Sequence, residues 1–381
     1  MKIDRIETFL VPPRWLFCRI ETDSGIVGWG EPIVEGRAEV VRTAVETLAE
    51  YLLGADPLRI ADHWQVMSKG GFYRGGPVLS SAVAGLDQAL WDIAGKSAGL
   101  PVSSLLGGAV RDRVRVYSWV GGDSPHELED AVAERLQLGF TAVKMNATDK
   151  MSPIATVAEL NAVVGRAEHV RNLLGPERDF AIDFHGRVNV PNAIALVRAL
   201  EAVRPMFVEE PLPPELNVAL PRVIDSTSIP IALGERLFSR SEFLPVLQSG
   251  VAVVQPDLSH AGGISEVTRI VALSETFGAL FAPHSPLGPI SLAASLQVSF
   301  STPSFLIQEQ SVGIHYHDST EFFDVVADPT PFDFIDGYAT LSTEVGLGIK
   351  VDEAAVRAAD RTGHSWRNPI WRGKDGAFIE W

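Results

Sequence analysis

The chain has 381 residues, of which 46% are apolar and 21% charged, and its formal net charge is −16. This composition is typical of a folded protein that buries a large core, and it excludes an intrinsically disordered chain. The acidic balance argues against a nucleic-acid partner, because nucleic-acid binding requires a basic face. The single cysteine, Cys18, excludes a disulfide framework.

No apolar stretch approaches the roughly 20 residues that a membrane-spanning helix needs. The first seven residues, Met-Lys-Ile-Asp-Arg-Ile-Glu, carry scattered charges and do not resemble a secretory signal peptide. We therefore expect a cytoplasmic protein that has no membrane partner.

Residues 1–111 have the pattern of a small α+β unit. Two strand-like runs, at 15–22 and 26–31, flank an Asp-Ser-Gly turn at 23–25, which is a hairpin signal. Apolar residues at spacings of three and four follow over residues 83–93, and this spacing predicts one face of a helix.

From residue 112 onward, short β-rich runs alternate with helical segments. This alternation indicates a parallel sheet, and eight such runs predict a (β/α)8 barrel over residues 112–340, near the usual length of about 250 residues. The C-terminal segment, 341–381, is too short to fold alone, and we expect it to pack back on the N-terminal unit. The eight runs lie at 114–120, 142–145, 180–184, 206–208, 231–233, 251–254, 279–282 and 305–307.

An acidic residue or a histidine follows each of six consecutive β-rich runs. The carboxyl ends of barrel strands meet at one rim, and the active sites of such barrels lie there. A polar side chain has no packing reason to recur at this point of every βα unit, so the recurrence predicts a functional site. The six residues are Asp183, Glu209, Glu235, Asp257, His284 and Glu309.

Three carboxylates on consecutive strands, Asp183, Glu209 and Glu235, predict a site for a hard divalent cation. Carboxylate oxygens are the ligands that Mg²⁺ prefers, and Mg²⁺ keeps further positions for water and substrate. Without a metal, converging carboxylates repel one another and some take up protons. The alternative is a rim of salt bridges with Arg187 and Arg236.

Two histidines near these carboxylates are candidates for proton transfer. His284 with Asp257 on the adjacent strand has the pattern of a base and the carboxylate that orients it. His185 lies two residues after Asp183, so both side chains point the same way on a strand. It is a further metal ligand, an acid or base, or a structural histidine of the rim.

The second strand of the barrel carries Lys144 and Asn146 on one face. A lysine there can meet an anionic substrate, although a solvated rim lysine has the same pattern. The segment 260–263, His-Ala-Gly-Gly, favours a tight strand-to-helix turn over a phosphate-binding loop. His315 and His317 follow the eighth strand, and the question of whether they line the site stays open.

A divalent cation beside a His–Asp base indicates removal of a proton next to a carboxylate. Such a proton is very weakly acidic, and its removal forms an enediolate. A bound Mg²⁺ with nearby hydrogen-bond donors stabilises that charge.

Nine segments of the chain carry a resemblance to a known family. On these segments the chain resembles the mandelate racemase subgroup of the enolase superfamily over essentially its whole length, and it looks most like the sugar-acid dehydratases of that subgroup. The nine segments lie at 12–15, 28–32, 71–77, 117–123, 183–187, 255–263, 283–289, 308–310 and 366–369.

The resemblance implies a role for each candidate residue. The three consecutive carboxylates would bind Mg²⁺ as the cofactor. His284, oriented by Asp257, would take the C2 proton of the substrate, and His185 would protonate the departing C3 hydroxyl. Glu309 and Lys144 would contact the substrate carboxylate.

One departure from the subgroup distinguishes between reactions. Racemases of the subgroup carry Lys-x-Lys on the second strand, where the second lysine is a base on the opposite face of the substrate. Here the stretch is Lys144-Met145-Asn146. Asparagine cannot act as a base, so the sequence argues against two-base racemisation and favours elimination of water. Asn146 then joins Lys144 and Glu309 among the expected substrate-binding residues.

The resemblance therefore implies a magnesium-dependent hydro-lyase that acts on an aldonate. It also implies a symmetric homo-oligomer, and a capping domain formed by residues 1–111 and 341–381, whose loops choose the substrate. Two alternatives stay open. One is a dehydratase that acts on another aldonate by the same mechanism, and the other is an inactive barrel retained as a binding or scaffold protein.

Overall fold

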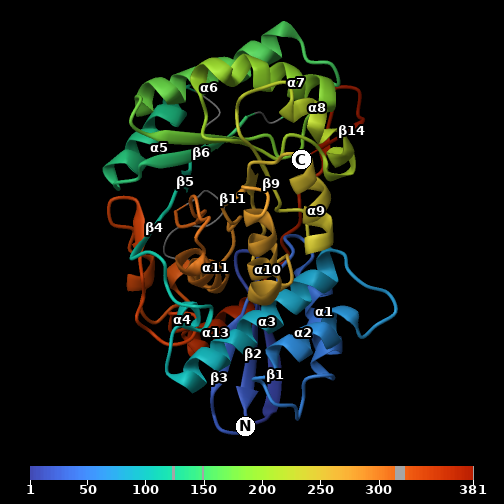
Figure 1. Cartoon of the computed structure of the whole chain (residues 1–381), viewed down its shortest axis with the longest axis vertical. Coiled ribbons are helices and arrows are strands. Elements are labelled where there is room, and N and C mark those ends of the chain that lie inside the picture. Colours follow the sequence, from blue (N-terminus) through green and yellow to red (C-terminus); the bar gives the residue numbers. More distant parts are fainter. Residues whose placement is uncertain (122–124, 148–149, 314–321, 381) are drawn as a thin grey trace.

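The structure, a computed structural model, describes residues 1–121, 125–147, 150–313 and 322–380 (Figure 1). A curled sheet of seven parallel strands forms its centre, with the strands in the order β11-β10-β9-β8-β7-β6-β5. The strands are β5 (Ser118–Trp119), β6 (Ala142–Asn146), β7 (Asp179–Asp183), β8 (Val208–Glu209), β9 (Ile231–Leu233), β10 (Val253–Val254) and β11 (Leu280–Phe281).

The eighth run of the predicted barrel closes this sheet. Phe305 forms a parallel bridge with Phe281 of β11, and Gln308 forms one with Val116, just before β5. The segment 305–308 therefore occupies the eighth strand position between the two edges. The predicted (β/α)8 barrel is confirmed.

The interior of the barrel is filled by side chains rather than being an open pore. Each of the eight strand positions contributes one buried residue to a single apolar cluster, and half of these residues are alanines. Such barrels have a packed interior rather than a pore, and here the four small side chains stand among four larger ones. The eight residues are Tyr117, Ala142, Ala181, Phe207, Ala232, Val253, Ala282 and Ile307.

Helices cover the outside of the barrel (Figure 1). Short-range hydrogen bonds fix where they begin. Thr156 and Glu159 form a reciprocal capping box at the start of α6. Asn189 caps α7, and this helix therefore begins at Val190. The helices are α5 (Pro125–Gln137), α6 (Val157–Leu174), α7 (Val190–Ala199), α8 (Leu220–Ile224), α9 (Arg240–Gln248), α10 (Gly263–Glu275) and α11 (Pro289–Ser301), with 3-10 turns η1 (Leu200–Val203), η2 (Pro214–Ala219) and η3 (Thr330–Phe332).

The first β-rich run of the barrel, expected at 114–120, divides into two strands. β4 (Arg113–Arg115) leaves the barrel sheet and pairs antiparallel with β12 (Tyr338–Thr340). The side chain of Arg115 lies at the amino end of the barrel, where its Nη1 donates to Asp179 Oδ2 at 2.8 Å. This contact keeps β4 at the amino end of the barrel and outside its sheet, and the parallel pairing of β5 starts only at Ser118.

A separate α+β unit lies at one end of the molecule (Figure 1). Its antiparallel sheet has the order β1-β2-β3, and β2 coincides with the expected strand at 15–22. The elements are β1 (Ile3–Val11), β2 (Trp15–Thr22), β3 (Val27–Gly30), α1 (Ala38–Ala49), α2 (Ile60–Lys69), α3 (Pro77–Ala98) and α4 (Val102–Leu105). None of the helices in the described ranges has the length and apolar character needed to cross a membrane.

Strand β3 lies directly against helix α3 because glycines face the helix. A Cβ atom added to Gly30 would lie 1.9 Å from the carbonyl oxygen of Gly85, and one added to Gly28 would lie 2.1 Å from that of Ala89. Asp92 of α3 also accepts a hydrogen bond from the backbone N–H of Trp29 at 3.0 Å. The close approach therefore requires glycine at both strand positions.

This unit is joined to the barrel by buried polar contacts. Glu31 accepts hydrogen bonds from the backbone N–H groups of Gly288 at 2.7 Å and Ser291 at 2.9 Å, at the amino end of α11. Gln88 accepts from the N–H of Glu31 and donates to the carbonyl of Leu258. A carboxylate at a helix amino terminus is favoured by the helix dipole. The N-terminal unit therefore caps the carboxyl rim of the barrel.

The C-terminal segment packs on the cap and then crosses to the barrel (Figure 1, red). Asp360 of α13 (Glu353–Thr362) accepts a hydrogen bond from the N–H of Leu10 in β1 at 2.7 Å. Further on, Lys150 Nζ donates to the carbonyl of Arg372, which lies in the β13–β14 hairpin. The limits of 111/112 and 340/341 between domains stay predictions. The hairpin strands are β13 (Trp371–Arg372) and β14 (Phe378–Ile379).

The contact between β3 and α3 predicts an unusually large effect of one methyl group. Gly30→Ala should lower the free energy of unfolding by at least about 1–3 kcal/mol, the usual cost of overpacking. Gly165→Ala is the matched control, because Gly165 lies inside α6 with no atom within 4 Å of the added Cβ. The control should be neutral or stabilise by about 0.5–1 kcal/mol. Urea unfolding of both variants measures the difference, and equal stability of the two would contradict the close packing.

Candidate active site

A cavity of about 770 Å³ lies at the carboxyl ends of the barrel strands. Polar side chains from the strands form one wall, and residues of the cap and of the C-terminal segment form the other. Glu209 and Asp257 stand behind this lining, where they are buried against Lys144 and His284. The other seven predicted site residues line it: Lys144, Asn146, Asp183, His185, Glu235, His284 and Glu309.

The three predicted metal ligands lie on neighbouring strands. Asp183 ends β7 and is paired in register with Glu209, which ends β8. Glu235 follows β9 by two residues, and β8 pairs with β9. The parallel pairing of three strands therefore brings the three carboxylates to one part of the rim.

Lys144 is the cation nearest to these carboxylates. Its Nζ lies 2.8 Å from Glu209 Oε1, 2.6 Å from Glu309 Oε1 and 3.9 Å from Asp183 Oδ2. The lysine is only 3% exposed. Burial lowers its pKa, but the attraction of Glu209 and Glu309 outweighs burial and holds the pKa well above its usual value. Lys144 is therefore a permanent positive charge inside the site.

One ammonium group does not satisfy the carboxylates. Burial raises the pKa of Asp183 and of Glu209; Lys144 opposes this shift, and the neighbouring carboxylates add to it. Glu209 Oε2 is buried and has no hydrogen-bond partner among the described residues. An unpaired carboxylate oxygen in such surroundings is costly. The donor set of three carboxylates fits a hard divalent cation such as Mg²⁺, which would remove both penalties.

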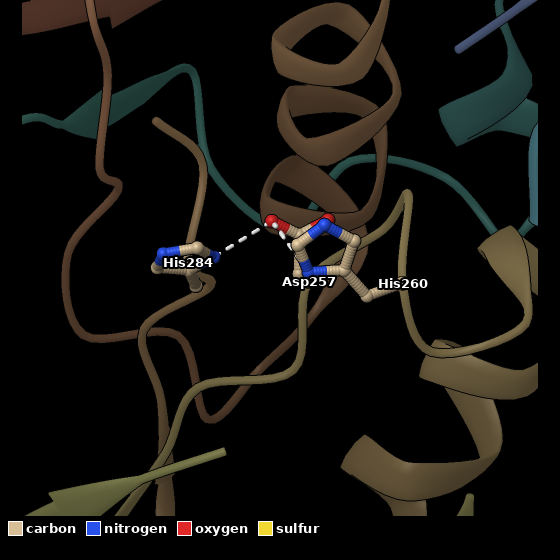
Figure 2. A group of neighbouring side chains, drawn as sticks. All are labelled: Asp257, His260 and His284. Carbon is tan, nitrogen blue, oxygen red and sulfur yellow. Dashed lines mark hydrogen bonds and ion pairs between the residues drawn. The ribbon is translucent and has the colours of Figure 1, made fainter. Parts of the chain in front are cut away.

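His284 and Asp257 form the expected dyad (Figure 2). His284 Nδ1 lies 2.8 Å from Asp257 Oδ2, and the other Asp257 oxygen accepts the N–H of Ser259 at 2.6 Å. His284 Nε2 lies 3.0 Å from Glu235 Oε2. Burial lowers the pKa of His284, but Glu235, Glu309 and Asp257 together raise it well above the usual value. Nε2 of His284 therefore lies on the side of the predicted metal ligands, and Nδ1 is held by Asp257.

Figure 2 places a second histidine beside this dyad. His260 Nδ1 lies 3.8 Å from Asp257 Oδ2, and the rings of His260 and His284 are 6.0 Å apart. One ligand atom from each of these three residues lies within 4.8 Å of the others. Sequence reasoning assigned His260 only to a turn, although its position three residues after Asp257 was a signal for the site.

His185 stands at the start of the loop after β7. Its backbone has a left-handed φ of 51°, a strained conformation that is common at functional sites. Its Nε2 lies 3.1 Å from Asp183 Oδ2, and its side chain is 34% exposed, on the cavity. Burial lowers the pKa of His185 to about 3. The imidazole is therefore neutral at neutral pH, and it can donate a proton to a leaving group only after it has taken one up.

The residues expected to bind the substrate carboxylate lie together. Glu309 Oε2 accepts the N–H of Ser285 at 2.8 Å, and its Oε1 contacts Lys144. Asn146 is paired in register with Asp183, and its Oδ1 lies 3.5 Å from Trp119 Nε1. An anionic substrate can therefore meet Lys144 beside the amide of Asn146.

The alternative of a salt-bridged rim receives little support from the geometry. Arg236 Nη2 pairs at 2.6 Å with Glu210, a buried residue that sequence reasoning missed. The guanidinium of Arg187 lies 4.8 Å from the ring centre of Trp371. Arg236 approaches Glu235 only at 3.7 Å. The close nitrogen partners of the three carboxylates are instead Lys144, His185 and His284. His315 and His317, which the sequence left open, lie outside the described residues.

The arrangement combines a base, an acid and a centre for negative charge. His284 follows β11 and His185 follows β7, four positions apart among the eight of the barrel, so they lie on opposite sides of the rim. Asp183 ends the same strand β7, and Glu209 and Glu235 lie between the two histidines in the strand order. Such a site can remove a proton from one carbon and protonate a group that leaves its neighbour.

Comparison with known families agrees with this architecture. The family described as "Enolase C-terminal domain-like" matches residues 127–355, and "Mandelate racemase / muconate lactonizing enzyme, N-terminal domain" matches residues 12–107. The D-galactonate dehydratase of Xanthomonas oryzae pv. oryzae (strain PXO99A) is 50% identical, over 100% of both chains. That of Cronobacter sakazakii (strain ATCC BAA-894) is 49% identical with the same coverage.

Solved structures show the same fold. An enolase from Agrobacterium radiobacter, described as a candidate galactarate dehydratase with Na and L-malate bound, has a TM-score of 0.91 at 30% identity over 100% of both chains. A mandelate racemase/muconate lactonizing enzyme candidate from Labrenzia alexandrii DFL-11 has a TM-score of 0.87 at 32% identity, over 94% of this chain and 96% of that one.

Proposed function

This chain belongs to the enolase superfamily, in its mandelate racemase/muconate lactonizing enzyme family, and we propose that it is a hydro-lyase that dehydrates D-galactonate. The products are 2-dehydro-3-deoxy-D-galactonate and water, which places the protein in sugar-acid catabolism. The observation that carries the proposal is the placement of two histidines, His284 with its Asp257 partner and His185, on opposite sides of the barrel rim beside a carboxylate cluster. Full-length relatives named D-galactonate dehydratase support the choice of substrate.

The substrate carboxylate is held at the strand ends. Lys144 attracts it, and Glu309, when protonated, donates a hydrogen bond to it. Asp183, Glu209 and Glu235 would hold Mg²⁺, which when bound would supply a Lewis acid for the negative charge that develops on this carboxylate. Lys144 and Glu309 orient the substrate carboxylate so that C2 lies next to His284.

Proton transfer is divided between two histidines. His284 Nε2 takes the C2 proton, and the contact of 2.8 Å to Asp257 holds the imidazole in the required orientation. His185 gives a proton to the C3 hydroxyl, which departs as water. The enol that remains tautomerises to the 2-keto-3-deoxy acid. Asn146 cannot act as a base at its position on β6, so inversion at C2 has no second base there.

Two alternatives share part of this account. A dehydratase of another aldonate would use the same residues and would differ only in contacts to the rest of the sugar chain. An inactive scaffold would need none of the charged groups, yet each proposed role is filled by a chemically competent side chain. The geometry therefore favours an enzyme.

A panel of aldonates tests the proposed reaction. Purified protein with Mg²⁺ should convert D-galactonate to the 2-keto-3-deoxy product well above its C4 epimer D-gluconate and its diastereomer D-mannonate, measured as product formed per unit time. Preference for another aldonate would be consistent with the mechanism but would contradict D-galactonate as the substrate. If no member of the panel gave a product, the proposal that the protein is a dehydratase would be wrong.

The metal site can be tested separately from activity. Asp183→Asn should weaken Mn²⁺ binding in calorimetric titration by more than tenfold, since even outer partners of a metal ligand contribute about 10–100-fold to affinity. Asp179→Asn is the matched control, because Asp179 begins the same strand at its other end. The control should bind Mn²⁺ like the wild type. Unchanged binding by Asp183→Asn would overturn the assignment of this ligand.

A further inference from the structure

One carboxylate of the cavity comes from the cap rather than from the barrel. Glu35 lies in the segment between β3 and α1 and lines the cavity together with Arg14, from the turn between β1 and β2. Both residues approach the loops that carry the His284–Asp257 dyad. The proton transfers proposed above use neither residue.

Arg14 is fixed between the cap and the barrel. It is 4% exposed, and its Nη2 donates to the carbonyl of Pro286 at 2.9 Å. Its guanidinium lies 5.3 Å from the ring centre of Trp366 in the C-terminal segment. The contact of Arg14 Nη1 to Glu35 Oε1, at 3.9 Å, is longer than a hydrogen bond. Arg14 thus forms a rigid, positively charged wall behind Glu35.

Glu35 keeps much of its capacity to accept hydrogen bonds. Its Oε2 lies 3.3 Å from His260 Nε2, and its side chain is 17% exposed. An ionised carboxylate has about four acceptor positions, and the contacts to His260 at 3.3 Å and to Arg14 at 3.9 Å, within the described part of the chain, leave room for further donors. Burial raises the pKa of Glu35, but His260 and Arg14 outweigh burial and bring it to about 2. Glu35 is therefore an anionic acceptor that faces the cavity.

The position of Glu35 decides which part of an aldonate it can meet. The carboxylate end is drawn to Lys144 and away from the negative charge of Glu35. The remainder of an aldonate is a neutral chain of hydroxyl groups, and a buried hydroxyl needs a hydrogen-bond partner. His260 lies between Glu35 and Asp257, so Glu35 stands on the wall that the cap supplies, one side chain removed from the dyad.

We propose that Glu35 determines specificity, by accepting hydrogen bonds from the hydroxyls at the far end of the aldonate and by excluding acids that carry a second carboxylate there. The inference rests on the proposed function and names the substrate class of the same site: long monocarboxylic polyols. It assigns the selection to one side chain of the cap.

The exclusion follows from charge. Galactarate has the configuration of D-galactonate at C2 to C5 and differs by a carboxylate at C6. That carboxylate would face the carboxylate of Glu35, and like charges brought together in a partly buried site act against the wrong ligand. L-Threonate keeps the C2 and C3 configuration but lacks the last two carbons, so Glu35 cannot reach its hydroxyls to the same extent.

The test is the steady-state kinetics of Glu35→Gln on these three acids. For D-galactonate, KM should rise about tenfold, the low end of the effect of a hydrogen bond to a charged group, while kcat stays within twofold. For L-threonate, KM should not change. The preference for D-galactonate over galactarate, as a ratio of kcat/KM, should fall at least tenfold.

Two further variants distinguish the effect of the charge at residue 35 from the effect of its side-chain length, and from the effect of removing any carboxylate in the cavity. Glu35→Asp keeps the charge on a shorter side chain, so it should still reject galactarate while KM for D-galactonate rises. Glu215→Gln removes an exposed carboxylate from the barrel side of the same cavity, and its preference should equal that of the wild type. Circular dichroism and the thermal midpoint of each variant confirm the fold.

The outcomes distinguish this inference from the proposed function. If the wild type dehydrates D-galactonate but Glu35→Gln keeps the same KM and preference, the inference is wrong and the function stands. An equal fall of kcat on all three acids would also overturn it, because Glu35 would then act through His260 on Asp257. If the wild type prefers another aldonate, the assignment of D-galactonate as substrate is wrong, but the inference about Glu35 is still testable. The same kinetics are then measured with the preferred aldonate, with its shortened analogue and with its diacid analogue.

Discussion

The burial of several ionised side chains at one rim of the barrel is the constraint on which the rest of the structure depends. Asp183, Glu209 and Glu309 surround the ammonium group of Lys144, while Glu235 contacts His284. Buried charges persist only where partners compensate for lost hydration. The protein alone leaves this cluster rich in carboxylates, and a divalent cation is the partner that its chemistry requires. A rigid barrel is needed to hold such a cluster together.

The cap contributes to the same site through polar contacts rather than a simple apolar cover. Glu31 caps helix α11, which begins five residues after His284, and Gln88 holds the loop that follows Asp257. Movement of the cap would therefore shift the positions of both His284 and Asp257. The C-terminal segment adds Trp371 to the wall of the cavity. The proposed substrate selection by the cap and the proposed proton transfer by the barrel would thus share one connected structure.

The barrel and its rim could be predicted from sequence because a parallel strand ends in the same place in every βα unit. That period located Asp183, Glu209 and His284 without knowledge of their contacts. The role of Glu35 could not be predicted in this way, since its contact with His260 joins segments more than two hundred residues apart. The departure of β4 from the sheet depends likewise on a distant partner, β12. The homo-oligomer and the individual residue roles stay predictions.

The central claim is that His284 acts as the base and His185 as the acid, and hydrogen exchange in D₂O tests this claim most directly. With Mg²⁺ and D-galactonate, His185→Asn should exchange the C2 proton for deuterium without inversion and without loss of water, because the base His284 remains and the acid is absent. His284→Asn should exchange nothing. NMR of the recovered substrate measures both results. Exchange that persists in His284→Asn, or a C2 epimer from either variant, would contradict the account.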